Sequence, residues 1–150
     1  MVEGVPVTER NLVDEFRLAF PEIEDQYRKK LNSWGDEHPG NYIVFAFVFK
    51  PFLKEELSKS ENEEFICRLC SFMERVCISG DLEAINVIWL KVFKLLLSDP
   101  KLVKLLWPLL GPTTKANIED AAGRWGLIRN LPVLARFPAV RFWIKQHLPN

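Results

Sequence analysis

The sequence predicts an all-α protein, a single compact multi-helix domain of antiparallel helical hairpins around a central helix from Asp81 to Leu97. The apolar residues of that stretch recur three or four positions apart, as on one face of a helix: Leu82, Ile85, Trp89, Val92 and Leu96. No segment shows the period-two alternation of a half-buried strand. The 10 prolines and 7 glycines are scattered, as at element boundaries within one domain. We therefore expect one domain over residues 1–150.

Two helices are predicted before residue 36. Thr8 is the expected N-cap of the first helix, which should stop at Phe20. Pro21 is expected to open the second helix, because its ring fixes the backbone angle of a first helical position. Gly35 should end it.

The apolar segment from Tyr42 to Phe49 fits two kinds of element, since Ile, Val and Phe favour strands and a short apolar run also suits a buried helix. A strand here would have no partner strand, and a lone strand is unstable. We therefore predict a buried helix with a kink or restart near Pro51.

Boundary residues divide the rest of the chain. A helix should begin at Ser60 or Asn62 and stop at Gly80, and Asp99-Pro100 should restart the chain after the central helix. A short helix is then predicted to end at Gly123. Beyond it, prolines at 132 and 138 predict only short helical turns.

Composition argues against several classes of protein. The longest apolar run is far shorter than the ~20 residues of a membrane-spanning helix. The first residues lack the basic and apolar regions of a secretory signal. An odd number of cysteines, three, is typical of free thiols in a reducing compartment. We therefore expect a cytoplasmic protein that does not bind membranes.

The cysteines and histidines do not form a metal site by spacing. Cys67 and Cys70 lie three apart, but a structural zinc site needs four ligands, and His38 and His147 show no matching pair spacing. Cys67, Cys70 and Cys77 are therefore predicted to be buried core thiols.

No catalytic arrangement stands out either. The sequence has no Ser-His-Asp pattern, and G-P-T-T at Gly111 to Thr114 lacks the glycine pair and the lysine of a phosphate-binding loop. We therefore expect a protein that is not an enzyme and that needs neither a metal nor a cofactor.

The charge is unevenly distributed, although the net charge is zero. Residues 1–90 hold 17 acidic and 10 basic residues, net −7, and residues 91–150 hold 3 acidic and 10 basic residues, net +7. Two candidate partner-binding surfaces follow, one acidic and one basic. The acidic candidates are Asp36, Glu37, Glu61, Glu63 and Glu64. The basic and aromatic candidates are Arg124, Arg129, Arg136, Arg141, Trp143 and Lys145.

The basic tail has three interpretations. Its arginines and aromatic rings suit a nucleic-acid backbone and its bases. They equally suit a terminal element whose aromatic rings fill the core while its arginines pair with the acidic first half, or a surface that docks on an acidic protein. Zero net charge favours the second interpretation over the first.

Several short sequence motifs also resemble those of a known family. They are Phe20-Pro21-Glu22-Ile23, the segment Tyr42 to Leu57 with K-P-F-L, M-E-R-V-C-I-S-G-D, E-A-I-N-V at Glu83 to Val87, and L-L-G-P-T-T at Leu109 to Thr114. Over roughly residues 12 to 120, the chain resembles an uncharacterised all-helical domain family of small bacterial proteins. Similar proteins are often encoded beside polymorphic toxins and act as immunity proteins. The resemblance implies a protein that neutralises a cognate toxin by occluding its active site. The alternative, which rests on the basic tail, is a nucleic-acid-binding regulator that uses its C-terminal arginines and aromatic rings.

Overall fold

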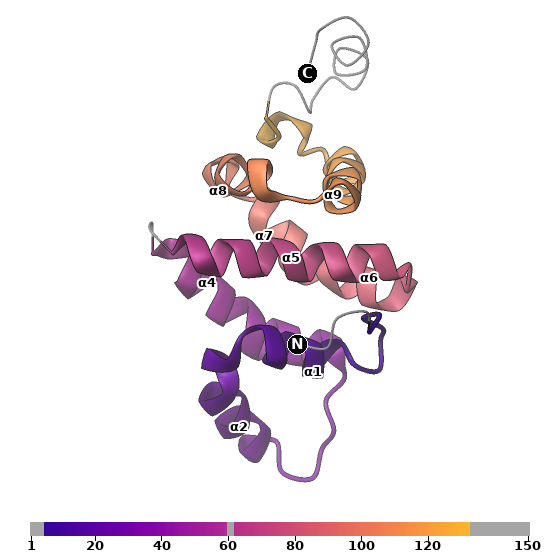
Figure 1. The fold of residues 1–150 in the computed structure, drawn as a ribbon. Coiled ribbons are helices and arrows are strands. Elements are labelled where there is room, and N and C mark those ends of the chain that lie inside the picture. Colours follow the sequence, from indigo (N-terminus) through magenta and orange to yellow (C-terminus); the bar gives the residue numbers. More distant parts are fainter. Residues whose placement is uncertain (1–4, 60–61, 133–150) are drawn as a thin grey trace, which may run out of the picture.

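The computed structural model describes residues 5–59 and 62–132, and over these residues it contains helices, turns and no strand. The predicted all-α class is therefore confirmed. The α-helices are α1 Leu12–Ala19, α2 Glu24–Ser33, α3 Asn41–Val44, α4 Lys50–Ser58, α5 Glu63–Ser79, α6 Leu82–Ile88, α7 Lys94–Leu97, α8 Pro100–Leu106 and α9 Pro112–Trp125. Figure 1 shows α1 and α2 at one end, α5 across the middle, and α8 and α9 at the other end.

Two π-helical turns join helices into longer continuous runs. Phe45–Phe49 connects α3 to α4, and Trp89–Phe93 connects α6 to α7. The helical interpretation of Tyr42 to Phe49 is thus confirmed. The kink or restart expected near Pro51 takes the form of this wider turn, which accommodates a residue that has no amide hydrogen.

Several predicted helix boundaries are confirmed. Asp99 Oδ1 accepts a hydrogen bond of 3.0 Å from the Lys101 amide. Asp81, the first residue of the predicted central helix, is a cap that was not predicted: its Oδ1 accepts a hydrogen bond of 3.0 Å from the Ala84 amide. Gly80 ends α5 with a φ of 73°, which glycine adopts without the steric cost that a Cβ would add. Asn62 is the N-cap of α5.

Two boundary predictions are wrong. Asn11, not Thr8, occupies the N-cap position of α1, and its side chain accepts a 2.7 Å hydrogen bond from the Thr8 amide. Gly123 lies inside α9, which ends instead at Gly126, where φ is 68°. A glycine in a helix costs only about 1 kcal/mol relative to alanine, so the segment is not obliged to stop at the first one. The short turns predicted around Pro138 lie outside the described residues.

The buried face of the central stretch differs from the predicted stripe. Leu82 is 75% exposed, whereas Ala84 and Ile88 before the π turn, and Phe93 and Leu97 after it, are buried. A π turn adds one residue to a helical turn and therefore rotates the following residues around the axis. One stripe of constant period could not describe both halves of this helix.

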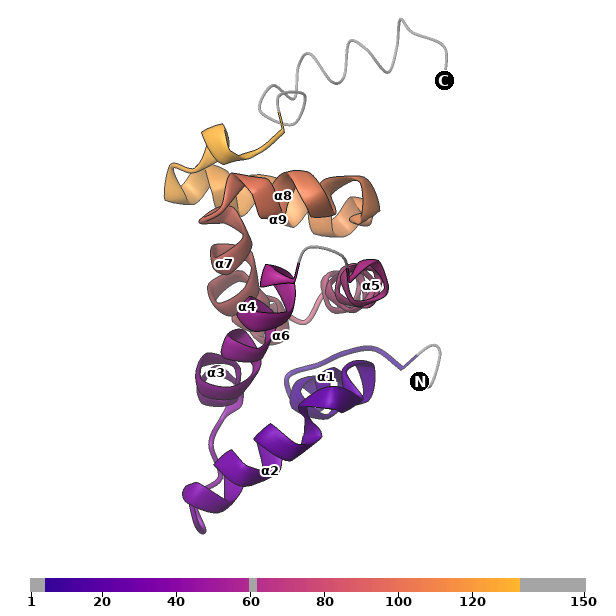
Figure 2. The ribbon, with the colours of Figure 1, turned by 90° about the vertical axis from the view of Figure 1, so that its left-hand side faces the viewer.

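The largest part of the core is a cluster of phenylalanines between α1, the α3–α4 run and α5. Phe16 lies at its centre, stacked on Phe49 with ring centroids 4.1 Å apart. Phe45 and Phe72 meet it edge-on at 5.3 and 5.4 Å. In Figure 2, α1 and α5 lie on one side of the molecule, with α3, α4 and α7 on the other. This packing leaves one strip of α5 facing outward.

Candidate functional site

The outward strip of α5 lines a pair of connected hollows. One, of about 380 Å³, lies between α1 and α5 and is lined by Leu18, Ala19, Glu64, Cys67, Arg68, Ser71, Phe72 and Arg75. The other, of about 290 Å³, lies beside the link from α8 to α9 and is lined by Cys70, Ser71, Glu74, Arg75, Ile78, Leu109 and Gly111. Because the two share Ser71 and Arg75, they form one surface, which we call the α5 face.

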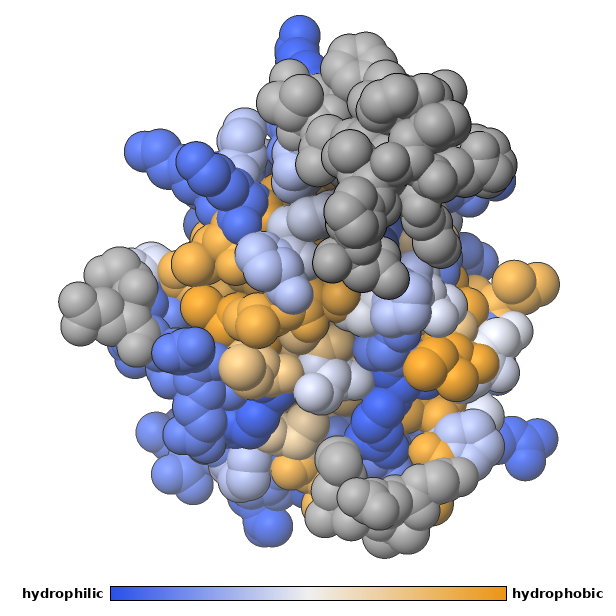
Figure 3. Space-filling view, turned by 45° about the horizontal axis from the view of Figure 1, so that its top comes forward, coloured by the Kyte–Doolittle hydropathy of each residue, from blue (hydrophilic) through white to orange (hydrophobic). Residues whose placement is uncertain are grey.

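Exposed apolar side chains stand along the α5 face. Leu18 is 58% exposed, Ile78 is 66% exposed and Leu109 is 43% exposed. Figure 3 views the molecule obliquely from this side and shows apolar patches bordered by hydrophilic side chains. Apolar groups in a hollow with a charged rim are typical of a surface that binds another protein.

Arg68 connects α5 to the turn that follows α1. Its two Nη atoms donate hydrogen bonds of 2.8 Å to the two carboxylate oxygens of Glu22, and Nη1 also donates to the Ala19 carbonyl at 3.0 Å. These hydrogen bonds hold the pKa of Glu22 below its ordinary value. The guanidinium also lies 5.4 Å from the centre of the Phe20 ring. Arg68 is therefore held in place as one wall of the hollow.

Two further arginines near this face also have carboxylate partners. Arg75 Nη2 donates to Glu15 Oε2 at 3.0 Å, and Arg17 pairs with Asp14 and Glu24. Carboxylates thus outnumber the arginines, and several remain accessible. The Glu64 side chain, whose Oε1 lies 3.7 Å from Arg68 Nε, is 84% exposed, and that of Asp14 is 71% exposed. The rim of the face therefore favours a positively charged partner.

Glu74 of α5 caps the N-terminus of α9. Its carboxylate accepts hydrogen bonds from the amides of Thr113 and Thr114, at 3.2 and 2.7 Å, and from the Thr114 hydroxyl at 2.7 Å. A Cβ on Gly111 would lie 2.2 Å from Glu74 Cδ, so glycine leaves room for this contact. The α8–α9 edge of the α5 face is thereby fixed to α5.

The Glu74 cap predicts a pH-dependent stability. Burial raises the pKa of Glu74, but the hydrogen bonds from Thr114 and Thr113 outweigh it, so the net pKa is lowered. The stabilisation should be fully present above the unfolded-state pKa and lost as pH falls through the lower folded-state pKa. Glu74→Gln should cost about 1 kcal/mol at neutral pH. Urea unfolding of both proteins at pH 7 and pH 3 should show the difference shrinking in acid, and a constant difference would contradict the account.

The acidic residues predicted from sequence lie in two separate places. Glu63 and Glu64 begin α5, so Glu64 lines the α5 face. Asp36 and Glu37 are exposed in the loop between α2 and α3, which Figure 1 places at the end of the molecule away from α9. Glu61 lies outside the described residues. The predicted acidic surface is therefore divided.

The basic residues predicted from sequence are only partly described. Arg124 of α9 pairs with Asp120 of the same helix at 3.2 Å, and its guanidinium lies 5.5 Å from the centre of the Trp89 ring. Arg129 is exposed in the turn Ile128–Asn130. Arg136, Arg141, Trp143 and Lys145 lie outside the described residues.

The cysteines differ from one another in exposure. Cys70 and Cys77 are buried, as predicted, and burial raises their pKa values to about 12 and about 11. Cys67 is exposed on the α5 face, so the prediction of a buried thiol is wrong there. Among the described residues, no three His, Cys, Asp or Glu side chains are grouped to hold a metal ion.

Sequence reasoning missed the apolar residues of the α5 face. Leu18 falls between the buried residues Phe16 and Phe20, on the opposite side of α1. A leucine on the polar side of an amphipathic helix was the available signal, although single exposed leucines are common. Ile78 and Leu109 gave no such signal, because their exposure depends on how α5 meets the α8–α9 link.

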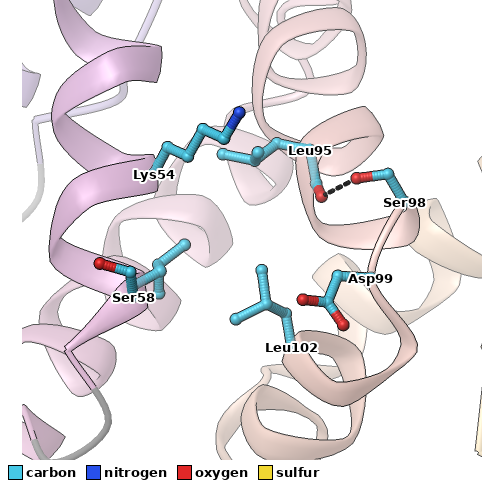
Figure 4. Close-up of a pocket in the computed structure, with 7 residues that line it drawn as sticks. Lys54, Ser58, Leu95, Ser98, Asp99 and Leu102 are labelled. Carbon is cyan, nitrogen blue, oxygen red and sulfur yellow. Dashed lines mark hydrogen bonds between the residues drawn. The ribbon is translucent and has the colours of Figure 1, made fainter.

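A different hollow, of about 240 Å³, lies between α4 and the turn from α7 to α8. Figure 4 shows Lys54, Ser58, Ser98 and Asp99 around it. Its polar groups mostly have local partners: Ser98 Oγ donates to the Leu95 carbonyl at 2.7 Å, and Asp99 caps α8. This hollow therefore offers fewer free groups than the α5 face.

Comparisons with known proteins give one match. A family model described as a domain of unknown function (DUF7674) matches residues 13–126, which include every residue of the α5 face. No curated protein and no solved structure matches the chain. Within the described part of the chain, none of the helices combines the length and apolar character needed to cross a membrane.

Proposed function

This chain belongs to the family described as a domain of unknown function (DUF7674), and we propose that it binds one partner protein over its α5 face. The observation that carries the proposal is the set of exposed apolar side chains, Leu18, Ile78 and Leu109, in hollows that charged side chains of both signs also line. Such apolar anchors with a polar rim are the usual anatomy of a protein interface. The face also rests on rigid helices, so little conformational entropy is lost on docking.

The partner class that the sequence resemblance supports is a toxin. In this proposal the chain acts stoichiometrically, as an immunity protein that covers the active site of its cognate toxin. Glu64, Glu22 and Asp14 each pair with an arginine of this chain, yet their side chains stay 84%, 41% and 71% exposed. They therefore remain accessible to the basic cleft of an enzyme that acts on an anionic substrate. Steric exclusion and electrostatic attraction would both contribute.

A growth-rescue assay tests this function. The candidate toxin is the protein encoded beside this chain, expressed in a host whose growth it arrests. Wild-type chain should restore growth, whereas Leu18→Asp should weaken binding at least about tenfold and lose rescue, because it places a charge on an apolar anchor. The matched control is Ile43→Asp, since Ile43 is 45% exposed on α3, on the other side of the molecule. It should rescue like wild type.

The rescue results distinguish a failure of the toxin hypothesis from a failure of the α5 face. Circular dichroism establishes that both variants are folded before rescue is scored. Loss of rescue with Leu18→Asp alone supports the proposal. Continued growth arrest despite ample folded wild-type chain would contradict the toxin hypothesis. Equal rescue by both variants would show that the α5 face does not bind the toxin.

A nucleic-acid-binding regulator is the second candidate. The observation in its favour is a cluster in which Trp89 and Trp125 pack edge-on with ring centroids 5.9 Å apart. Lys94 lies over the Trp125 ring and Arg124 over the Trp89 ring. Lysine, arginine and tryptophan together suit a nucleic-acid backbone and its bases. Titration of single- and double-stranded DNA and RNA should then show binding that falls steeply with salt. No binding at low salt would eliminate this candidate.

A further inference from the structure

The exposed strip of α5 has the geometry of a helix surface that lacks one neighbour. α5 packs against α1, α6 and α9. Its strip, from Glu64 to Ile78, covers about 21 Å at the rise of an α-helix. Resting on the protein-binding function proposed above, we infer that the partner docks an amphipathic α-helix with basic flanking side chains along this strip.

The backbone chemistry of the face favours a helix over an extended segment. The strip belongs to α5, whose amides and carbonyls bond within the helix, and the Ala19 carbonyl at its edge already accepts from Arg68. An extended segment that binds by strand addition needs backbone partners of the kind that a sheet edge offers. The described residues contain no strand to supply them. A helix satisfies its own backbone and needs only side-chain contacts.

The hollows set the spacing of the apolar anchors. The first is lined by α5 residues from Glu64 to Arg75, and the second by α5 residues from Cys70 to Ile78. The second lining is therefore displaced by three to six residues along α5, about 4.5–9 Å. Apolar side chains at i and i+4 of a second helix, about 6 Å apart along its axis, have a separation in this range. Volumes of about 380 and 290 Å³ leave room for leucine-sized side chains.

The charges set the flanking residues. Arg75 is held by Glu15. Arg68 has two carboxylates beside it, Glu22 at 2.8 Å and Glu64 at 3.7 Å, so the negative charge here exceeds the positive charge. The Glu64 side chain remains 84% exposed. A lysine or arginine beside the first anchor would reach Glu64, whereas a glutamate there would be repelled.

Fluorescence anisotropy with synthetic peptides and the full chain tests this inference. The probes are two 16-residue amphipathic helical peptides with identical leucine anchors, flanked by lysines in one and by glutamates in the other. The lysine peptide should bind at least about tenfold more tightly at low salt. Glu64→Lys should weaken it about three- to tenfold, and Glu55→Lys, the same charge change at an exposed site on α4, should leave its affinity within about twofold of wild type.

Three results would contradict parts of this inference. Equal affinity for the two peptides, or equal weakening by Glu64→Lys and Glu55→Lys, would overturn the basic flanks. Undiminished binding of a lysine peptide whose helix is broken by two prolines would overturn the helical docking mode. If Leu18→Asp abolishes growth rescue but leaves the affinity for the lysine peptide unchanged, the helical docking mode is overturned and the proposed function remains.

Discussion

Replacing Phe16 with alanine is expected to lower the free energy of unfolding by about 3–5 kcal/mol. Phe16 is fully buried and stacks on Phe49 with ring centroids 4.1 Å apart. It also contacts Phe20, Phe45, Phe52 and Phe72, so the change opens a cavity at the meeting point of α1, the α3–α4 run and α5. Urea unfolding followed by circular dichroism measures the loss.

Phe47 provides the matched control. It lies in the same π turn as Phe45 and Phe49, but it is 60% exposed. Phe47→Ala removes the same atoms and should cost no more than about 1 kcal/mol, because little buried surface is lost. If the two variants lost equal stability, the phenylalanine cluster would not be the centre of the core.

Replacing Arg75 with methionine should lower the free energy of unfolding by about 2–4 kcal/mol at neutral pH. Its partner Glu15 is nearly buried, with 9% of the side chain exposed against 20% for Arg75. The substitution leaves a desolvated carboxylate without its 3.0 Å hydrogen bond. The pair also connects α1 to α5, so the change acts on both walls of the first hollow.

A second substitution and an exposed pair serve as controls. Adding Glu15→Leu to Arg75→Met removes the stranded carboxylate and should recover most of the loss. Arg124→Met breaks the exposed pair with Asp120 on α9 and should cost no more than about 0.5 kcal/mol. A loss at Arg75 that the double variant does not recover would show that the charge of Glu15 is not its cause.

Local signals predicted the helices and many of their ends. Asp81 and Asp99 offer carboxylate acceptors at helix starts, and Gly80 supplies the left-handed residue at a helix end. Each of these effects acts within one turn of the chain, so the sequence contains all of it. The apolar segment Tyr42 to Phe49 needed one further argument, the lack of a partner strand.

Contacts between distant parts of the chain were not predicted. Glu74 caps α9 across 40 positions of sequence, and no local pattern links it to Thr114. The π turn at Trp89–Phe93 rotates the residues that follow it, whereas residue spacing alone assumes a constant helical period. These contacts depend on how helices pack and not on how each one forms.

The candidate site shows the same division. Glu64 was found because it is one of several acids at a helix start, and the structure places it on the α5 face. Leu18 and Cys67 were not predicted as site residues, since the hollow around them forms only when α1 and α5 pack together. Asp36 and Glu37 were grouped with Glu64 by charge alone and lie elsewhere. Charge composition identified acidic residues but not the surface to which each belongs.

The natural thiol of Cys67 offers the most direct test of partner binding at the α5 face. Cys67 is exposed there, whereas burial of Cys70 and Cys77 raises their pKa values to about 12 and about 11 and leaves little reactive thiolate. Iodoacetamide should therefore label a single thiol in the free protein, which mass spectrometry counts.

The partner identified by growth rescue should slow this labelling at least about tenfold when it is bound in excess, because it covers the thiol. The control is Cys67→Ser combined with Ser98→Cys, which moves the reactive thiol to the hollow between α4 and α8. That thiol should react equally fast with and without the partner. Unchanged labelling of Cys67 in a saturated complex, with protection at Ser98→Cys instead, would contradict docking on the α5 face.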